Sequence, residues 1–380
     1  MWDRRRTDVS GTMLLVLLGF MVCCDVTAGG ADTGDFVWEE RSNIVVNQTQ
    51  EGYALTIRMP NAVSDRPDAL ICAGVKLNPK ESYLIRFHPH ARKETAHHMM
   101  VYGCHVPGST ASSWSCFNSD GVDDNSVCGD SDRQILFAWA LDAPDKALPE
   151  GVGFRIAGST GIDYLVIQLH YAMEFPPGVT DNSGVTLDIT YTRPSQLANY
   201  YVLGDWGSIP PKSKAYTMDS ACVYSNNFTI YPIGYRTHSH NLGMVTAGYR
   251  IRDGKWTEIG RMSPQLPQTF YPVSHPGMDI REGDILASRC TMNSMSRDDV
   301  TKIGSTNHDE MCNFYIMYST YNYEQRQTEY CFKDADAYTW SSQFDPSVIP
   351  ADVSSLDGIP GAEEVIQKFN DPDREHSTHG

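Results

Sequence analysis

The chain has 380 residues, of which 41% are hydrophobic, and a formal net charge of −17 at pH 7. This acidic balance argues against a nucleic-acid-binding protein, because such proteins carry basic surfaces that neutralise phosphates. The length also exceeds what one hydrophobic core usually supports, so we expect two domains.

Residues 1–28 have the features of a secretory signal peptide. Three arginines at positions 4–6 precede an apolar run from Met13 to Val22, and small residues lead to Ala28. The run is too short to cross a bilayer, and no later segment has the length of a membrane helix. We therefore expect cleavage near Ala28, no transmembrane segment beyond the signal peptide, and a protein of the secretory pathway lumen or secretory granules, or a secreted one.

The mature chain is predicted to be all-β. Short runs rich in β-branched and aromatic residues alternate with clusters of Pro, Gly, Asn and Asp. The runs are 53–59, 83–87, 164–171, 185–191, 244–251 and 313–318. Two antiparallel β-sandwich (jelly-roll) domains are the architecture that this pattern favours. We place them at residues 35–195 and 196–340, with the boundary at Arg193-Pro194-Ser195.

Three histidines in the first predicted domain are candidate metal ligands. His170 lies on the less apolar face of the strand 164–171, together with Val166 and Gln168. A single strand histidine is more often a hydrogen-bonded core residue. His97 and His98 are adjacent, so joint binding of a metal requires a bulge, a turn or a strand end. Without other support, such a pair would be two unrelated surface histidines.

The second predicted domain contains a different candidate set. His238 and His240 are two residues apart, so on a strand both imidazoles would face the same way. Met311 alone would be core filling, but its neighbour Cys312 could hold it in place through a disulfide. Imidazole with thioether suits copper that changes oxidation state. A structural zinc site would more often use clustered thiolates, and a blue-copper site would need one.

Residues 341–380 form an acidic tail with few large apolar residues. We expect this tail to be mostly disordered, with one short helix around residues 362–369.

Eight of the ten cysteines remain after removal of Cys23 and Cys24 with the signal peptide. An even number in an oxidising compartment indicates disulfides, and four cysteines lie on each side of residue 200. The sequons at Asn47 and Asn227 are candidate glycosylation sites.

Five segments together resemble the copper type II, ascorbate-dependent monooxygenases, and most of all the members that hydroxylate peptidylglycine. The segments are 97–104, 165–171, 235–243, 264–272 and 309–315, and the resemblance covers about residues 50–335. It implies that His97, His98 and His170 bind an electron-storing copper, and that His238, His240 and Met311 bind the copper that activates dioxygen. It also implies that Arg236, Asn313 and Tyr315 bind the carboxylate of a C-terminal glycine. The implied disulfides are Cys72–Cys116, Cys104–Cys128, Cys222–Cys331 and Cys290–Cys312.

The function that this resemblance implies is hydroxylation of the glycine α-carbon in glycine-extended peptides, the first step of C-terminal amidation. Two copper ions would be cofactors, ascorbate the electron donor and dioxygen the co-substrate, and a separate lyase would complete amidation. Leu70-Ile71 stands where the family has a tyrosine, which affects the expected preference for peptide side chains. One alternative is β-hydroxylation of a phenethylamine of the dopamine type, and another is a secreted copper-binding protein without turnover.

Overall fold

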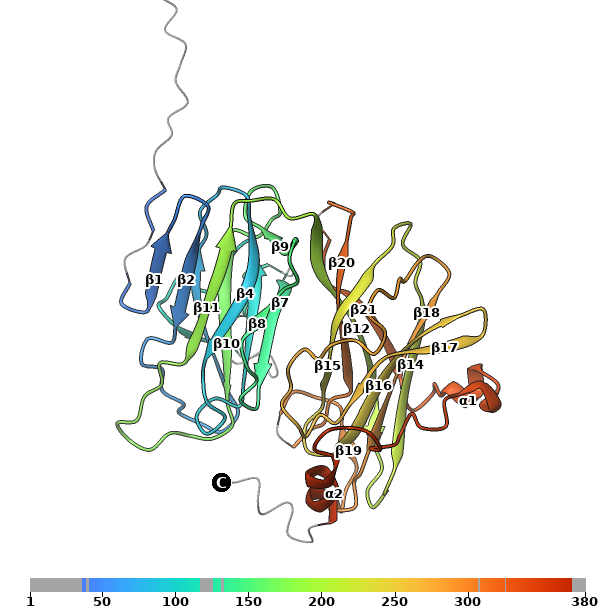
Figure 1. Cartoon of the computed structure of the whole chain (residues 1–380). Helices are drawn as coiled ribbons and strands as arrows, with labels where there is room; N and C mark the ends of the chain where they lie inside the picture. Colours follow the sequence, from blue (N-terminus) through green and yellow to red (C-terminus); the bar gives the residue numbers. More distant parts are fainter. Residues whose placement is uncertain are drawn as a thin grey trace, which may run out of the picture. The chain divides into compact units, whose positions relative to one another are not determined.

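The computed structural model describes residues 36–38, 41–116, 126–130, 133–306, 308–324 and 326–370. The expected signal peptide, residues 1–28, lies outside this part of the chain. The described residues from Trp38 onward belong to one compact unit. Strands dominate this unit, and Figure 1 shows them as extended, mostly antiparallel sheets with little helix.

Two sheets are built from the strands that precede residue 195. The first contains β1 (Ile44–Gln48), β2 (Gly52–Arg58), β11 (Gly184–Thr190), β4 (Ser82–His90), β8 (Lys146–Ala147) and β9 (Val152–Ile156). The second contains β6 (Trp114–Ser115), β3 (Ala69–Lys76), β10 (Tyr164–Tyr171), β5 (His98–Cys104) and β7 (Arg133–Ala140).

These two sheets share one hydrophobic core. In β2 the buried side chains alternate, as Tyr53, Leu55 and Ile57, because successive residues of a strand face opposite ways. Phe87 of β4 and Phe137 of β7 stack with their ring centroids 4.4 Å apart and so connect the sheets directly. The predicted strand 164–171 coincides with β10, and the other predicted runs overlap strands of the structure.

The strands after residue 195 form a second pair of sheets. One contains β12 (Gln196–Trp206), β20 (Asn313–Thr320), β15 (Tyr231–His238) and β21 (Glu329–Asp334). The other contains β14 (Tyr216–Val223), β18 (Ile285–Met292), β16 (Gly243–Arg252) and β17 (Lys255–Met262), and β13 (Ser208–Ile209) pairs with β19 (Thr301–Lys302). Two pairings are parallel, β12 with β21 and β12 with β9. The pairing of β12 with β9 joins the sheet that contains β1 to the sheet that contains β20, so that their strands form one continuous hydrogen-bonded sheet.

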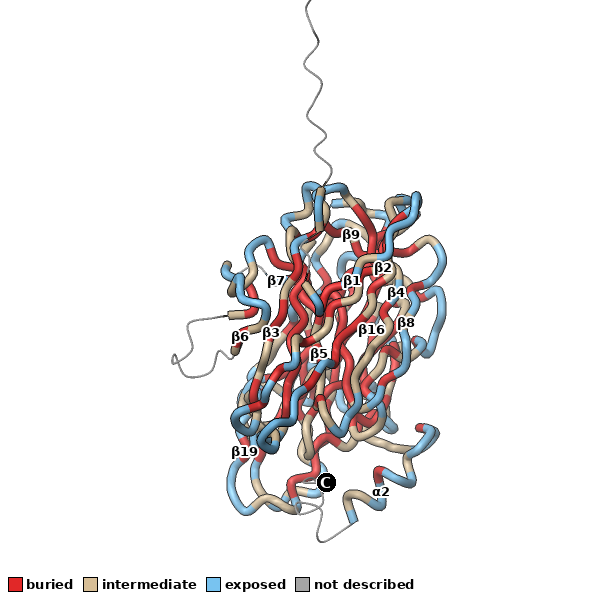
Figure 2. Tube along the Cα trace, turned by 90° about the vertical axis from the view of Figure 1, so that its left-hand side faces the viewer, coloured by how far each residue is buried: buried red, intermediate tan, exposed pale blue. Residues whose placement is uncertain are grey.

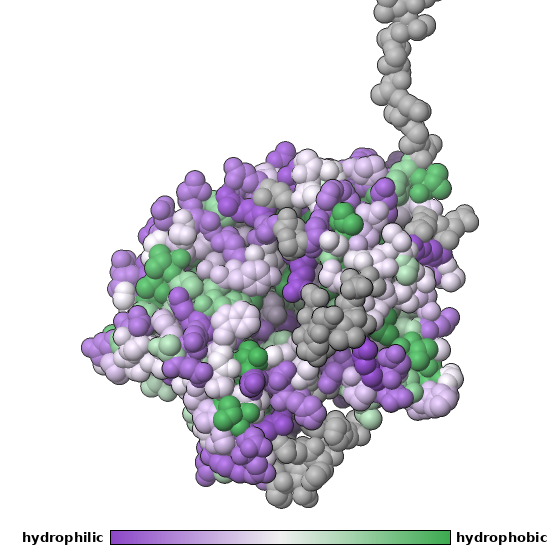
Figure 3. All heavy atoms as spheres, turned by 180° about the vertical axis from the view of Figure 1, so that it is seen from behind, coloured by the Kyte–Doolittle hydropathy of each residue, from purple (hydrophilic) through white to green (hydrophobic). Residues whose placement is uncertain are grey.

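Buried residues follow the strands, and exposed residues gather at the loops (Figure 2). On the face that Figure 3 shows, hydrophilic side chains predominate and hydrophobic ones form small, scattered patches. Among the residues that the structure describes, no helix is long and apolar enough to span a membrane.

Four disulfides form with the pairings that the family resemblance implies, and one of them, Cys222–Cys331, joins strands of two different sheets, β14 and β21. They are Cys72–Cys116, Cys104–Cys128, Cys222–Cys331 and Cys290–Cys312. Each bridge joins cysteines from the same side of residue 195. Asn47 and Asn227, the two sequon asparagines, are both exposed.

The expectation of a mostly disordered tail is wrong for residues 341–370. Helix α1 (Trp340–Gln343), the 3-10 turn η1 (Pro346–Val348) and helix α2 (Ala362–Asn370) form here, and α2 matches the predicted short helix. Val353, Ile359 and Val365 are buried. A few well-spaced apolar residues therefore hold this segment in place, although its average composition is acidic and polar.

Candidate metal and substrate site

The antiparallel pairing of β5 with β10 brings the first three histidines together. His98 is the first residue of β5 and pairs with His170 near the end of β10. His97 precedes the strand, and its backbone N–H donates to the carbonyl of His170 (2.9 Å). The adjacent pair therefore lies at a strand end, which is one of the arrangements that joint binding requires.

The Nδ1 atoms of these histidines converge on one point. The Nδ1 atom of His170 lies 3.2 Å from that of His97 and 3.3 Å from that of His98. One nitrogen from each ring lies within 4.8 Å of the others, close enough for one metal ion. His170 Nε2–H donates to Asp68 (3.0 Å), which leaves its Nδ1 lone pair toward the cluster.

The electrostatic environment of this cluster favours neutral imidazoles. Burial, aided by the neighbouring His170, lowers the pKa of His97 to about 4 and lowers that of His98 well below its usual value. Neutral imidazole is the form that binds a metal.

The second candidate set lies where β15 meets the segment before β20. The expectation that a strand carries both His238 and His240 is wrong, because β15 ends at His238. Their rings are tilted by 78° with centroids 5.5 Å apart. Beyond the strand, the side chains of Gln265 and Gln268 donate to the carbonyls of His240 (2.6 Å) and Ser239 (3.1 Å).

Both histidines of this set present Nε2 as the free nitrogen. His238 Nδ1–H donates to Gln268 Oε1 (2.6 Å), and His240 Nδ1–H donates to the carbonyl of Asp309 (3.0 Å). Met311 lies just before β20, next to the Cys290–Cys312 bridge to β18. Its Sδ accepts a weak hydrogen bond from Asn313 Nδ2 (3.7 Å). The donors available here are therefore two imidazoles and a thioether.

Glu310 holds this second set together, and the sequence alone assigned it no role. It is fully buried, and its carboxylate accepts backbone N–H groups from His240, Leu242 (2.7 Å) and Met311 (2.7 Å). Burial raises the pKa of Glu310, while His240 and these N–H groups oppose the rise. One carboxylate thus links the backbones of two candidate ligands that lie 71 positions apart in the sequence. The acidic pair Asp309-Glu310 before Met311 has no periodicity or spacing that could have revealed this.

A pocket of about 370 Å³ is lined by residues of both candidate sets, including His98, His238 and Met311. The ring centroids of His98 and His238 lie 6.3 Å apart. Leu70, at the position where the family resemblance implied a tyrosine, also lines this pocket.

The register of β15 with β20 places the three predicted carboxylate-binding residues beside this pocket. Arg236 pairs with Tyr315, and His238 pairs with Asn313. Arg236 and Tyr315 line the pocket, with the guanidinium carbon 5.3 Å from the tyrosine ring centroid. The strand pair therefore places His238 and Asn313 two positions along from Arg236 and Tyr315.

Arg236 is a buried cation without an anionic partner. Only 2% of its surface is exposed, and it donates to the carbonyl (2.9 Å) and the side-chain oxygen (3.1 Å) of Gln268. Among the described residues no carboxylate forms an ion pair with it. Burial lowers its pKa, with Tyr315 opposing. A buried charge is normally paired, so this guanidinium is prepared for an anion that enters the pocket.

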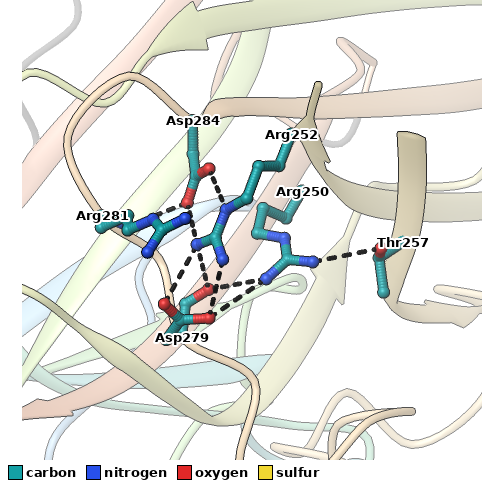
Figure 4. A network of polar contacts seen from close by, with 6 residues as sticks. All are labelled: Arg250, Arg252, Thr257, Asp279, Arg281 and Asp284. Carbon is teal, nitrogen blue, oxygen red and sulfur yellow. Dashed lines mark hydrogen bonds and ion pairs between the residues drawn. The ribbon is translucent and has the colours of Figure 1, made fainter. Parts of the chain in front are cut away.

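Other arginines in the same half of the chain do form ion pairs with carboxylates. Arg250 and Arg252 both pair with Asp279, and Arg252 also pairs with Asp284 (Figure 4). Two histidines outside the candidate sets have carboxylate partners: His88 contacts Asp145 and Asp188, and His105 contacts Asp163.

Comparison with known proteins gives two matches to one family, described as copper type II ascorbate-dependent monooxygenase. Its N-terminal domain matches residues 55–175, and its C-terminal domain matches residues 197–344. A peptidyl-glycine alpha-amidating monooxygenase A of Xenopus laevis is 44% identical over 278 residues, which are 72% of this chain and 29% of that protein. A peptidylglycine alpha-amidating monooxygenase of Rattus norvegicus is 43% identical over 70% of this chain and 27% of its own length. A human dopamine beta-hydroxylase is 26% identical over 74% of this chain and 48% of its own. The chain thus spans less than a third of the length of these two amidating relatives.

Proposed function

Because the chain belongs to the copper type II, ascorbate-dependent monooxygenase family, we propose that it hydroxylates the α-carbon of the C-terminal glycine in glycine-extended peptides. The observation that carries this proposal is the buried, unpaired Arg236 in one pocket with His238 and Met311. A guanidinium pairs with a carboxylate through two directed, charge-assisted hydrogen bonds. A glycine carboxylate bound by Arg236 would bring its α-carbon near the donors of the second set.

The donor sets fit two copper ions. Three converging Nδ1 atoms from His97, His98 and His170 suit one ion, and two imidazoles with the thioether of Met311 suit an ion that cycles through Cu(I). Copper bound at these sites would supply the redox chemistry, with ascorbate as the source of electrons and dioxygen as the source of the inserted oxygen.

The protein's own residues orient the substrate relative to these donors. Gln268 contacts Arg236 and His238 at once, so the carboxylate anchor and one proposed ligand share a support. In this proposal Tyr315 and Asn313 complete the carboxylate site. Positioning of this kind supplies a large part of rate acceleration.

Two further parts of the proposal concern the setting of the reaction. We place the protein in the secretory pathway, which the four disulfides support. Cleavage of the hydroxyglycine product to the amide would be the work of a separate lyase. We also propose two domains that meet near Arg193–Ser195, which the two family matches support.

The alternatives explain the pocket less well. A phenethylamine carries an ammonium group, which Arg236 would repel, and the dopamine beta-hydroxylase relatives are less similar to this chain. A copper-binding protein without turnover would not need a buried arginine that pairs with no carboxylate among the described residues.

A direct test supplies the purified protein with copper, ascorbate, dioxygen and a peptide ending in glycine. We expect a product one oxygen atom heavier than the peptide, detected by mass spectrometry. The same peptide ending in an amide should stay unchanged and should not stimulate oxygen consumption. If phenethylamines were hydroxylated and glycine-extended peptides were not, the proposal would be wrong. If no peptide stimulated oxygen consumption although two copper ions were bound, the copper-binding protein without turnover would be favoured.

Replacing Glu310 with glutamine should weaken the second copper site and leave the first unchanged. The amide group of glutamine would point an N–H donor at backbone N–H groups that the carboxylate now accepts. Loss of a group that orients metal ligands typically lowers metal affinity about 10- to 100-fold. Titration of Cu(I) against a competing chelator measures each site. Glu258→Gln on β17 is the matched control, and equal weakening of both sites in Glu310→Gln would contradict this role.

A further inference from the structure

The site pocket contains a second cation besides Arg236. Arg133 and Arg236 both line it, and none of its described lining residues is acidic. The chain as a whole has a formal net charge of −17. The pocket is therefore a locally positive region in an otherwise acidic protein, and only Arg236 has a role in the reaction proposed above.

Arg133 lies where the pocket meets solvent. It is the first residue of β7 and the only exposed one, because the rest of the strand is buried. Its guanidinium carbon lies 5.7 Å from the ring centroid of Tyr102, which also lines the pocket. Within the described part of the chain, Arg133 has no carboxylate partner. The side chain is thus free to pair with an anion that arrives from solvent.

The charge of Arg133 reaches the place where the glycine would bind. Burial raises the pKa of Tyr315, and the charges of Arg236 and then of Arg133 oppose this rise. Arg133 acts in the same direction on Tyr102 and Tyr330. The two arginines therefore act on the same tyrosine, one from the buried end of the pocket and one from its exposed end.

We propose that Arg133 is a specificity-determining residue that selects glycine-extended peptides with an acidic side chain at one of the two positions before the glycine. This inference rests on the proposed function. With the glycine carboxylate held by buried Arg236, the preceding residues must leave through the solvent-exposed end of the pocket, where Arg133 is located. An aspartate or glutamate there would give Arg133 the anionic partner that it does not have among the described residues.

The test compares glycine-extended peptides that differ only in having glutamate, glutamine or lysine before the glycine, and a second set with the change one position earlier. An exposed ion pair contributes up to about 1 kcal/mol, so we expect up to about fivefold higher kcat/KM for glutamate than for glutamine in one set. Lysine should be the poorest. Added salt should reduce the preference, because exposed pairs are screened.

Two variants and one control assign the effect to Arg133. Arg133→Gln should remove the preference, and Arg133→Glu should reverse it toward lysine. Arg281→Gln removes an exposed arginine that does not line the pocket and should keep the preference. Equal rates for glutamate and glutamine peptides in the unmodified protein would overturn the inference. The inference would also be overturned if Arg133→Gln lowered kcat/KM equally for all peptides. The same holds if the substitution changed only the KM for ascorbate, because ascorbate is itself an anion that Arg133 could bind.

Failure of the inference can be separated from failure of the proposed function. If neutral glycine-extended peptides are hydroxylated without preference for glutamate, only the role of Arg133 is wrong. If no peptide is hydroxylated, the proposed function is wrong. Binding of the same peptides to the copper-loaded protein without ascorbate then still measures whether glutamate is preferred and whether Arg133 is the cause.

Discussion

Replacing Met311 with isoleucine is expected to abolish hydroxylation while the three-histidine site keeps its copper. Isoleucine fills similar space but has no sulfur, so the second set retains only His238 and His240. Loss of a group that merely orients a ligand costs about 10- to 100-fold, so loss of the ligand itself should exceed about 100-fold. The first set lies on β5, on β10 and just before β5, and none of its described hydrogen bonds involves Met311, so its affinity should be unchanged.

Product formation measured by mass spectrometry, together with copper content, tests this expectation. Met292→Ile is the matched control, because Met292 is fully buried near the same disulfide but does not line the pocket. We expect Met292→Ile to keep turnover even if it lowers the melting temperature. If Met311→Ile hydroxylated peptides at the wild-type rate, the assignment of Met311 to the second copper site would be wrong.

Replacing Arg236 with glutamine is expected to raise the peptide KM strongly while both copper ions stay bound. Truncating one partner of a buried charge pair costs about 2–5 kcal/mol, which is roughly 30-fold to several thousandfold in KM. Copper content should stay the same because Arg236 donates no hydrogen bond to His238 among the described contacts and is linked to it through Gln268. The unliganded protein should also stay folded, because the substitution removes a buried charge that pairs with no carboxylate among the described residues.

Steady-state kinetics with one glycine-extended peptide, together with metal analysis, tests this second expectation. Arg250→Gln is the control: it removes an arginine that is paired with Asp279 away from the pocket, so it should affect stability and leave KM unchanged (Figure 4). Arg236→Lys should recover part of the affinity, since it restores the charge without the paired donors. Loss of copper in Arg236→Gln, with an unchanged KM, would show that Arg236 is structural.

Local sequence patterns predicted much of the fold, because they record which residues face a core. Strand β10 was predicted at its true bounds from alternating residues between turn signals. The same reasoning was wrong about His240, because a dipeptide spacing does not show where a strand ends. It was also wrong about residues 341–370, where average composition concealed buried Val353, Ile359 and Val365.

The sequence by itself determined the family, the all-β class and the residue types that are available as donors, because these depend on residue identity and local spacing. The family resemblance also predicted the four cysteine pairs that form disulfides in the structure. Only the tertiary structure decided how the donors meet: β5 against β10 for the first set, and β15 against β20 for the second. It alone revealed Glu310, Gln268 and Arg133, since each acts through contacts with residues far away in the chain. Such contacts have no local pattern, because packing between distant segments creates them.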